Sequence, residues 1–403
     1  MSADPCPPVF FNPEFPPPGA VHPIGAPLLL RGFAALADRP VLGIVAKVGD
    51  RTLLRGRLND SREDVLRAYP PSRRYDLPRG YQYYVELPAE FGEGVYRIDY
   101  FAEPEGGGLV PLGHRDLRLS ATEGDVVNPF PDGHFYSPVV NLRELLRDRD
   151  RVWPKDPAVL GVDFRRDAQL RFLTEECPKY LGEFDYPFDP PPGAPEYAFR
   201  LNNPVFAPVD AKTLFVMLRS LRPATMIEVG SGFSSLLVAD VNRRFLGGRL
   251  AFTCIEPYPR PFLRDGIPGL ARVIDRRVQE VPLGEYDALG PGDVLFIDSS
   301  HVAKTGSDVN HLFFEVIPRL KAGVVIHVHD IFLPHDYPPW RVLAEKLSWT
   351  EQYVLRALLM FTDAFEVLFG VGYAEHHFPD RMRDIVHQGT WSVGASFWFR
   401  KTR

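Results

Sequence analysis

Residues 227–235 read Ile-Glu-Val-Gly-Ser-Gly-Phe-Ser-Ser, and the architecture of this chain can be inferred outward from them. An apolar run ends at Val229, and glycines follow at positions 230 and 232. Glycine lets the backbone turn tightly and approach a ligand closely. A helix that begins behind such a turn offers free N–H groups to the same ligand. Taken alone, a Gly-x-Gly segment is also typical of an ordinary strand–helix turn.

The surrounding pattern indicates an α/β fold. From residue 224 onward, apolar runs of three to seven residues alternate with helical stretches such as Ser234–Phe245 and Asp308–Leu320. Short apolar runs of this kind are typical of buried strands in a parallel sheet. We therefore predict a doubly wound, mostly parallel seven-stranded sheet. Its predicted strands are Met226–Val229, Phe252–Ile255, Arg272–Ile274, Val294–Ile297, Val324–Val328, Phe365–Val371 and Ser396–Arg400.

Acidic and imidazole side chains follow three of these strands. Glu256 ends the second strand, 256 − 232 = 24 positions after Gly232, where a carboxylate can accept hydrogen bonds from ribose hydroxyls. The fourth strand ends in Asp298, and the fifth ends in His329 and Asp330. Because ligands bind at the carboxyl ends of parallel strands, we expect these side chains to face one crevice. The pattern favours a ribose-bearing cofactor.

At these motifs the chain resembles the class I S-adenosylmethionine-dependent methyltransferases. The resemblance covers roughly residues 200–403. Within the class, it is most similar to the branch of macrocin-type sugar O-methyltransferases and cephalosporin-hydroxylase-like proteins. In that fold the last strand runs antiparallel to the others. The segments that carry the resemblance are Ile227–Gly232, Ile255–Pro257, Leu295–His301, Pro318–Gly323 and Ser396–Phe399.

The resemblance implies a cofactor site. Residues 230–232 would hold the amino-acid part of S-adenosylmethionine, and Glu256 would hold the ribose. Residues 278–280 would lie near the adenine, and Asp298 would face the methionine end or the substrate. The implied cofactor-binding residues are Glu228, Gly230, Ser231, Gly232, Glu256, Gln279 and Asp298.

The resemblance also implies a metal site, since the sugar O-methyltransferases bind a divalent cation through acids at the ends of the fourth and fifth strands. The corresponding residues are Asp298, His329 and Asp330. Histidine stands at position 329 where the family usually has aspartate, and a softer imidazole ligand favours Mn²⁺ or Fe²⁺ over Mg²⁺. The predicted catalytic residues are His301, Asp298 and His329. His301 is a candidate general base, or a loop histidine satisfied by Asp298.

The expected function is transfer of a methyl group from S-adenosylmethionine to a small-molecule hydroxyl, on a sugar or a glycosylated natural product. One alternative is an oxidoreductase that uses nicotinamide or iron in the same crevice. Another is a non-catalytic partner module. A nicotinamide is disfavoured because Ser235 stands where the dinucleotide motif usually has glycine or alanine. The intact turn and Glu256 disfavour the non-catalytic module.

The N-terminal part is predicted to be a separate β domain. Alternating runs at Leu42–Val48 and Thr52–Leu58, joined by Gly49-Asp50, indicate a hairpin. This region resembles immunoglobulin-like domains that accompany some carbohydrate-active enzymes. We expect a Pro-rich tail at 1–20, a β-sandwich at 21–122 without catalytic groups, and a methyltransferase domain at 123–403. The last would comprise a connector, 123–210, and a catalytic core, 211–403.

Composition and net charge limit the classes of partner that we expect this chain to bind. The chain has 403 residues and a net charge of −6, which argues against a general nucleic-acid binder. Its three cysteines are far apart, so a disulfide framework and a zinc site are not expected. We find no membrane span and no secretory signal in the sequence, which favours a cytoplasmic enzyme. A small molecule is the expected partner, and homo-oligomers remain open.

Overall fold

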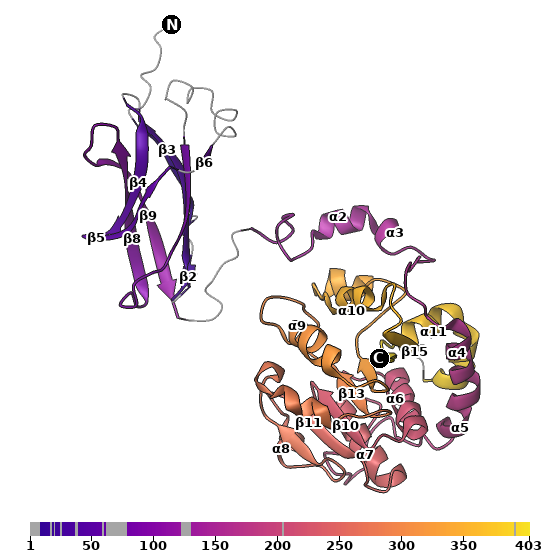
Figure 1. The fold of residues 1–403 in the computed structure, drawn as a ribbon. Helices are drawn as coiled ribbons and strands as arrows, with labels where there is room; N and C mark the ends of the chain where they lie inside the picture. Colours follow the sequence, from indigo (N-terminus) through magenta and orange to yellow (C-terminus); the bar gives the residue numbers. More distant parts are fainter. Residues whose placement is uncertain are drawn as a thin grey trace. The chain divides into compact units, whose positions relative to one another are not determined.

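The computed structural model describes residues 9–16, 18–19, 21–24, 26–36, 39–58, 60–61, 79–121, 130–203, 205–390 and 392–403. The chain divides into two compact units, Met1–Ser137 and Pro138–Arg403 (Figure 1). The domain boundary that we expect at residues 122 and 123 lies outside the described residues. None of the helices in the described part of the chain has the length and hydropathy that a membrane span requires.

The first unit contains two β-sheets, of order β1-β3-β7-β6 and β2-β9-β8-β4-β5. Neighbouring strands pair antiparallel, except that β2 pairs parallel with β9. The predicted hairpin at Gly49-Asp50 joins β4 to β5, which confirms that prediction. The strands are β1 (Val9–Phe15), β2 (Val21–Pro23), β3 (Leu28–Leu36), β4 (Val41–Val48), β5 (Arg51–Arg57), β6 (Asp60–Ser61), β7 (Arg79–Val85), β8 (Gly94–Pro104) and β9 (Val110–Ser120).

The β domain begins earlier than the sequence suggests. Residues 9–15 form a strand that pairs with β3, rather than part of a Pro-rich tail over residues 1–20. This strand lies at the edge of its sheet, where Pro13 is tolerated because an edge strand does not need every N–H group for pairing. The ring of Phe11 lies 5.3 Å from that of the buried Tyr100. Packing of this aromatic pair therefore helps to hold the strand on the domain core.

The second unit is built on one seven-stranded sheet of order β12-β11-β10-β13-β14-β16-β15. The pairings among β10 to β14 are parallel, whereas β16 is antiparallel to both of its neighbours. This topology confirms the predicted fold class. The strands are β10 (Thr225–Val229), β11 (Ala251–Ile255), β12 (Arg272–Ile274), β13 (Val294–Ile297), β14 (Val325–Val328), β15 (Phe365–Gly370) and β16 (Phe397–Lys401).

Helices surround this sheet (Figure 1). The helix predicted at 308–320 is interrupted: α9 continues as a π-turn at Leu312–Val316 and a 3₁₀-turn at Ile317–Arg319, where Pro318 lacks a backbone donor. The helices are α2 (Leu142–Arg147), α3 (Arg149–Val152), α4 (Arg166–Arg171), α5 (Cys177–Leu181), α6 (Pro208–Leu221), α7 (Phe233–Phe245), α8 (Pro261–Arg264), α9 (Asp308–His311), α10 (Glu351–Leu359), α11 (Val371–His377) and α12 (Pro379–Arg381).

One buried histidine belongs to the core of the sheet. The ring of His327 stacks between Phe296, 4.0 Å away, and Trp398, 3.9 Å away. These three residues are direct neighbours on β13, β14 and β16. His327 is fully buried, and neither of its ring nitrogens has a hydrogen-bond partner within the described residues. His327 is therefore a core residue of the sheet.

We expect His327→Phe to reduce the acid sensitivity of the second unit. Burial lowers the pKa of His327 well below 6.5, so the folded chain keeps the ring neutral. The unfolded chain binds a proton below about pH 6.5, and the stability lost as pH falls comes from this difference. Between pH 7.5 and pH 5.5, the wild type should lose about 1.4 kcal/mol more unfolding free energy than the variant.

Urea unfolding followed by tryptophan fluorescence measures this difference. All five tryptophans lie within residues 138–403, so the signal reports on the second unit alone. The same pH dependence in the wild type and the variant would contradict the expectation.

Candidate active site

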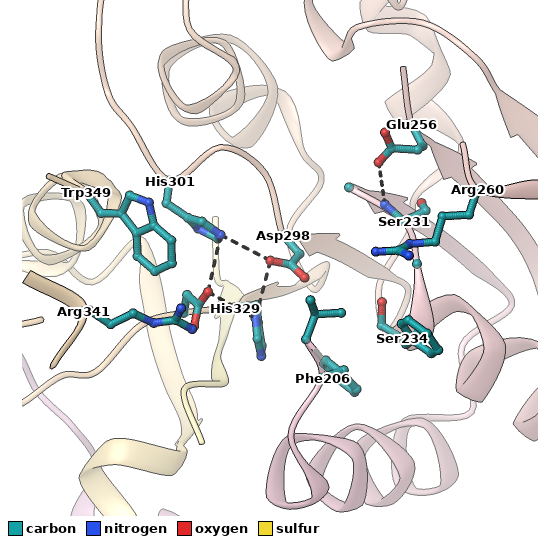
Figure 2. A pocket seen from close by; sticks show the side chains of 15 residues that line it. Phe206, Ser231, Ser234, Glu256, Arg260, Asp298, His301, His329, Arg341 and Trp349 are labelled. Atoms are coloured by element: carbon teal, nitrogen blue, oxygen red, sulfur yellow. Dashed lines mark hydrogen bonds and ion pairs between the residues drawn. The ribbon is translucent and has the colours of Figure 1, made fainter. Parts of the chain in front are cut away.

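A cavity of about 380 Å³ lies at the carboxyl edge of the sheet (Figure 2). We call it the first cavity. Its lining comes from the ends of four adjacent strands and from the loops beyond them. The strand-end residues among its lining are Gly230, Ser231, Gly232, Glu256, Asp298, His329 and Asp330. The predicted crevice is therefore present, and most of the predicted site residues line it.

The glycine turn fits closely against the end of β13. Gly230 has a φ of +81°, and a Cβ atom there would overlap the backbone oxygen of Asp298. The N–H of Gly230 donates to the carbonyl oxygen of Ile255, 3.0 Å away. The N–H of Ser231 donates to Oε2 of Glu256, also at 3.0 Å. The turn is thus tied to β11 on one side and to β13 on the other.

Glu228 lies behind the turn and is not among the residues that line the cavity. It is fully buried, and its carboxylate accepts hydrogen bonds from the hydroxyls of Ser234 at 2.6 Å and Ser235 at 2.5 Å. Burial raises the pKa of Glu228 to about 7, although the two hydroxyl donors oppose this shift. Since both serines belong to the first turn of α7, Glu228 fixes where that helix begins.

The end of the cavity beside the glycine turn contains a cationic side chain, Arg260. The guanidinium of Arg260 lies 5.3 Å from the ring centre of Phe233, and both residues line the cavity. Gln279, predicted to lie near an adenine, is not among the lining residues, and its Nε2 donates to the carbonyl oxygen of Gly306 at 3.0 Å. Glu256 lines the cavity and also accepts a hydrogen bond from the N–H of Tyr258 at 2.8 Å.

At the other end, the carboxylate of Asp298 lies between two imidazoles (Figure 2). Its Oδ1 is 3.4 Å from Nε2 of His301 and 3.4 Å from Nδ1 of His329. Each imidazole uses its second nitrogen to contact another acid. For His301 this is Glu351, at 2.8 Å, and for His329 it is Asp210, at 3.3 Å.

His301 is held from both sides. Its Nδ1 donates to the fully buried carboxylate of Glu351, and its carbonyl oxygen accepts from the N–H groups of Thr350 and Glu351 at 2.9 and 3.1 Å. Its φ of +61° lies in the left-handed region, as does that of Asp330 at +57°. Such backbone strain costs about 1–3 kcal/mol per residue and persists where surrounding contacts enforce it. The start of α10 supplies these contacts to His301.

Asp210 anchors the second imidazole. Its buried carboxylate accepts hydrogen bonds from the N–H groups of Ala395, at 3.0 Å, and Ser396, at 2.9 Å, just before β16. It does not cap α6, the role suggested by its place near the start of that helix. His329 is buried, with Nε2 toward Asp210 and Nδ1 toward Asp298.

Opposite charges set the pKa values of this cluster. Burial opposes the charge on His301, but its hydrogen bonds to Asp298 and Glu351 prevail and raise its pKa to about 10. Burial also opposes the charge on His329, and the nearby Asp298 and Asp330 raise its pKa well above 6.5. Burial would raise the pKa of Asp298, but His329 and His301 hold it below its usual value. The raised pKa values of both imidazoles favour their charged forms.

The geometry changes the set of candidate metal ligands. Asp298, His301 and Asp330 can each offer one atom, and these atoms lie within 4.8 Å of one another. The sequence predicted Asp298, His329 and Asp330. His329 is not in this group, although its Nδ1 lies 3.4 Å from Asp298 and 3.9 Å from Asp330.

Four side chains that define this end of the site were not identified from the sequence as site residues. They are Asp210, Arg341, Trp349 and Glu351. Arg341 Nη2 lies 3.6 Å from Asp330, and its guanidinium stacks 4.9 Å from the ring centre of Trp349. The centre of the Trp349 ring lies 4.4 Å from that of His301, and Trp349 lines the cavity.

Comparisons with known proteins point to the same region. Residues 227–331 match the family described as a methyltransferase domain. A protein of Archaeoglobus fulgidus, described as uncharacterized, is 38% identical over 177 residues, which cover 43% of this chain and 79% of the relative.

Two solved structures resemble the two parts of the chain. The fibronectin(III)-like modules of Clostridium thermocellum CbhA are 12% identical, with a TM-score of 0.19, over 28% of this chain and 97% of theirs. A structure of cmcI with Mg-SAM is 16% identical, with a TM-score of 0.29, over 54% of this chain and 88% of its own. We base no functional conclusion on these two likenesses.

We expect Gly230→Ala to disrupt the turn. The new Cβ would force the backbone at Asp298 to move, and alanine is strained at a positive φ, so a loss of about 2–4 kcal/mol of unfolding free energy is expected. Gly232→Ala is the matched control, since its Cβ would meet nothing nearer than Arg260 Nε at 4.0 Å. Equal urea midpoints for the two variants would show that the close approach at Gly230 is unimportant.

Proposed function

Because this chain belongs to one family with the Archaeoglobus fulgidus protein and contains an S-adenosylmethionine-dependent methyltransferase domain, we propose that it methylates a hydroxyl group of a small-molecule acceptor. The observation that carries the proposal is that His301, whose Nδ1 is hydrogen-bonded to the buried Glu351, lines the same cavity as the glycine turn. The choice of a sugar hydroxyl rests on the resemblance of the sequence motifs to the macrocin-type branch.

The glycine turn and Glu256 would hold the cofactor. Backbone N–H groups at the start of α7 lie beside a carboxylate at the end of β11, an arrangement suited to an amino acid joined to a ribose. Glu228, predicted to contact the cofactor, would act from behind by fixing the helix start. When bound, the cofactor supplies an electrophilic methyl group on a positively charged sulfur.

His301 would accept the proton of the acceptor hydroxyl. The cofactor would supply the methyl group to the acceptor oxygen, and Nε2 of His301 would take up the hydroxyl hydrogen. Nδ1 of His301 remains hydrogen-bonded to Glu351. The carboxylate of Glu351 would orient the ring and stabilise the imidazolium, as the acid that backs a general base does in other enzymes. Asp298 and Asp330 lie 3.4 and 3.6 Å from Nε2 and stabilise the same charge.

This arrangement keeps the charge of the site constant. Methyl transfer removes a positive charge from sulfur and releases a proton from oxygen. A proton held by His301 restores the lost charge among the surrounding carboxylates. Those carboxylates belong to Asp210, Asp298, Asp330 and Glu351.

A divalent cation is the second candidate for the same place, because three donors converge there. Two carboxylates and an imidazole whose other nitrogen donates to Glu351 fit a metal such as Mn²⁺. When bound, such a cation would lower the pKa of the acceptor hydroxyl. His301 Nε2 would then be a ligand and could not accept the proton, so the two roles exclude each other.

We expect Glu256→Ala to weaken binding of S-adenosylhomocysteine by about 10- to 100-fold, since a charged hydrogen-bond partner contributes roughly 1.5–3 kcal/mol. Glu256→Gln, which keeps an acceptor for one hydroxyl, should lose less. Calorimetry gives the affinities, and a urea melt of each variant checks that the turn still folds. Unchanged affinity in Glu256→Ala would reject this cofactor site.

We expect turnover of glycosides to rise with pH. A base must be unprotonated, so kcat/KM should increase about tenfold per unit from pH 7 until it levels near the His301 pKa of about 10. His301→Gln should abolish this dependence. Glu351→Gln removes an anion that raises the pKa, so its profile should level at lower pH. The assay follows transfer of labelled methyl groups from S-adenosylmethionine.

The same assay separates the base from the metal. The proposed base predicts full activity in excess EDTA. Loss of activity that Mn²⁺ restores, with cofactor affinity unchanged, would replace the base by the cation.

A further inference from the structure

A second cavity, of about 490 Å³, opens on the same unit. Its walls are formed by the segment after β14, the start of α11, the loop before β16 and the residues after α3. The residues on which its chemistry depends are Trp153, Phe332, His335, Glu375, His376 and Val393. None of them lines the first cavity.

The two cavities share a wall. Asp330 and Arg341 line the first cavity, and residues 332–339 between them contribute to the second. Asp330 contacts His301 at 3.6 Å, and Phe332 follows it by two residues, a span of at most about 7 Å. On another side, Gly394 precedes Ala395, whose N–H donates to Asp210 beside His329.

Hydrogen bonds hold the segment that forms this wall in place. Gln352 is buried, and its side chain accepts from the N–H of Phe332 at 2.5 Å and donates to the carbonyl oxygen of His335 at 2.9 Å. The indole N–H of Trp153 donates to the carbonyl oxygen of Tyr337 at 2.7 Å. The second cavity is therefore a formed site in the structure as it stands.

The first cavity has little room for an acceptor beside the cofactor. Its 380 Å³ lies near the lower end of the roughly 300–1,000 Å³ that a single drug-sized ligand occupies. The cofactor alone, a nucleoside joined to an amino acid, is a ligand of that class. A bound cofactor would therefore leave limited volume in this cavity for an acceptor, and a neighbouring cavity could hold the rest of it.

The lining of the second cavity selects a flat apolar group. Trp153, Phe332 and three prolines line it, together with the imidazoles of His335 and His376, whose Nε2 and Nδ1 atoms lie 3.2 Å apart. Burial and the neighbouring His376 lower the pKa of His335, which favours its neutral form. Asp336 and Glu375 bring negative charge, and no Arg or Lys is among the described lining residues. An anionic ligand is therefore disfavoured.

We propose that the second cavity binds an aromatic, uncharged or cationic part of the acceptor, while the hydroxyl to be methylated reaches His301. This inference rests on the proposed function and specifies its substrate class as an aryl-bearing hydroxyl compound, such as an aryl glycoside.

The test compares two uncharged probes that share a sugar, 4-nitrophenyl β-D-glucopyranoside and methyl β-D-glucopyranoside. Their affinities for the full chain, saturated with S-adenosylhomocysteine, are measured by saturation-transfer NMR. The aryl glycoside should bind at least tenfold more tightly. Its anionic counterpart, 4-carboxyphenyl β-D-glucopyranoside, should bind more weakly than the nitrophenyl compound.

Val393 provides the matched variants, because its side chain lines the cavity and is 46% exposed. Val393→Trp should fill the cavity and bring the affinity ratio close to one, whereas Val393→Ala should preserve it. Val393→Phe replaces the tryptophan variant if that variant unfolds at a lower temperature. Equal affinities for the two neutral glycosides, or a ratio that survives Val393→Trp, would overturn the proposal. A wild-type chain that fails to bind S-adenosylhomocysteine would instead refute the proposed function.

Discussion

The carboxylate of Asp298, shared by two imidazoles that are each backed by another acid, is the interaction on which the site depends. It follows β13, and its backbone oxygen leaves no room for a side chain at Gly230. One residue thus joins the glycine turn to the His301–Glu351 pair. Three strand ends and the start of α10 must be in register for these contacts to form, so the chemistry of the site is a consequence of how the parallel sheet is assembled.

The sequence was sufficient for the sheet and for the residues at its strand ends. Both depend on local signals, namely short apolar runs and a glycine turn, and residues such as Glu256 and Asp298 follow directly from strand ends. No local signal of this kind identified Glu351 or Asp210 as site residues. Glu351 meets His301 across 50 residues, and Asp210 meets His329 across 329 − 210 = 119. Only the packing of α10 and α6 against the sheet brings them there.

Expectations based on amino-acid composition were wrong where a residue lies in a structural context that is unusual for its type. Prolines suggested a tail for residues 1–20, yet Pro13 lies in an edge strand, where the missing donor costs little. Trp349 has the large apolar area that is typical of a core residue, but its ring packs on His301 at the cavity wall. An aromatic ring has the same hydropathy in a core and in a binding site, so the sequence alone does not separate the two.

The start of α10 has a consequence for how this enzyme could diversify. Two consecutive residues make hydrogen bonds to different parts of the site: Glu351 binds the ring of His301, and Gln352 binds the segment that begins with Phe332. His301, the proposed base, and the wall of the second cavity therefore share one support. Changes in side chains along residues 332–339 could alter acceptor choice while the base stays in place, as long as this helix end is kept. A shift of α10 itself would alter selectivity and chemistry together.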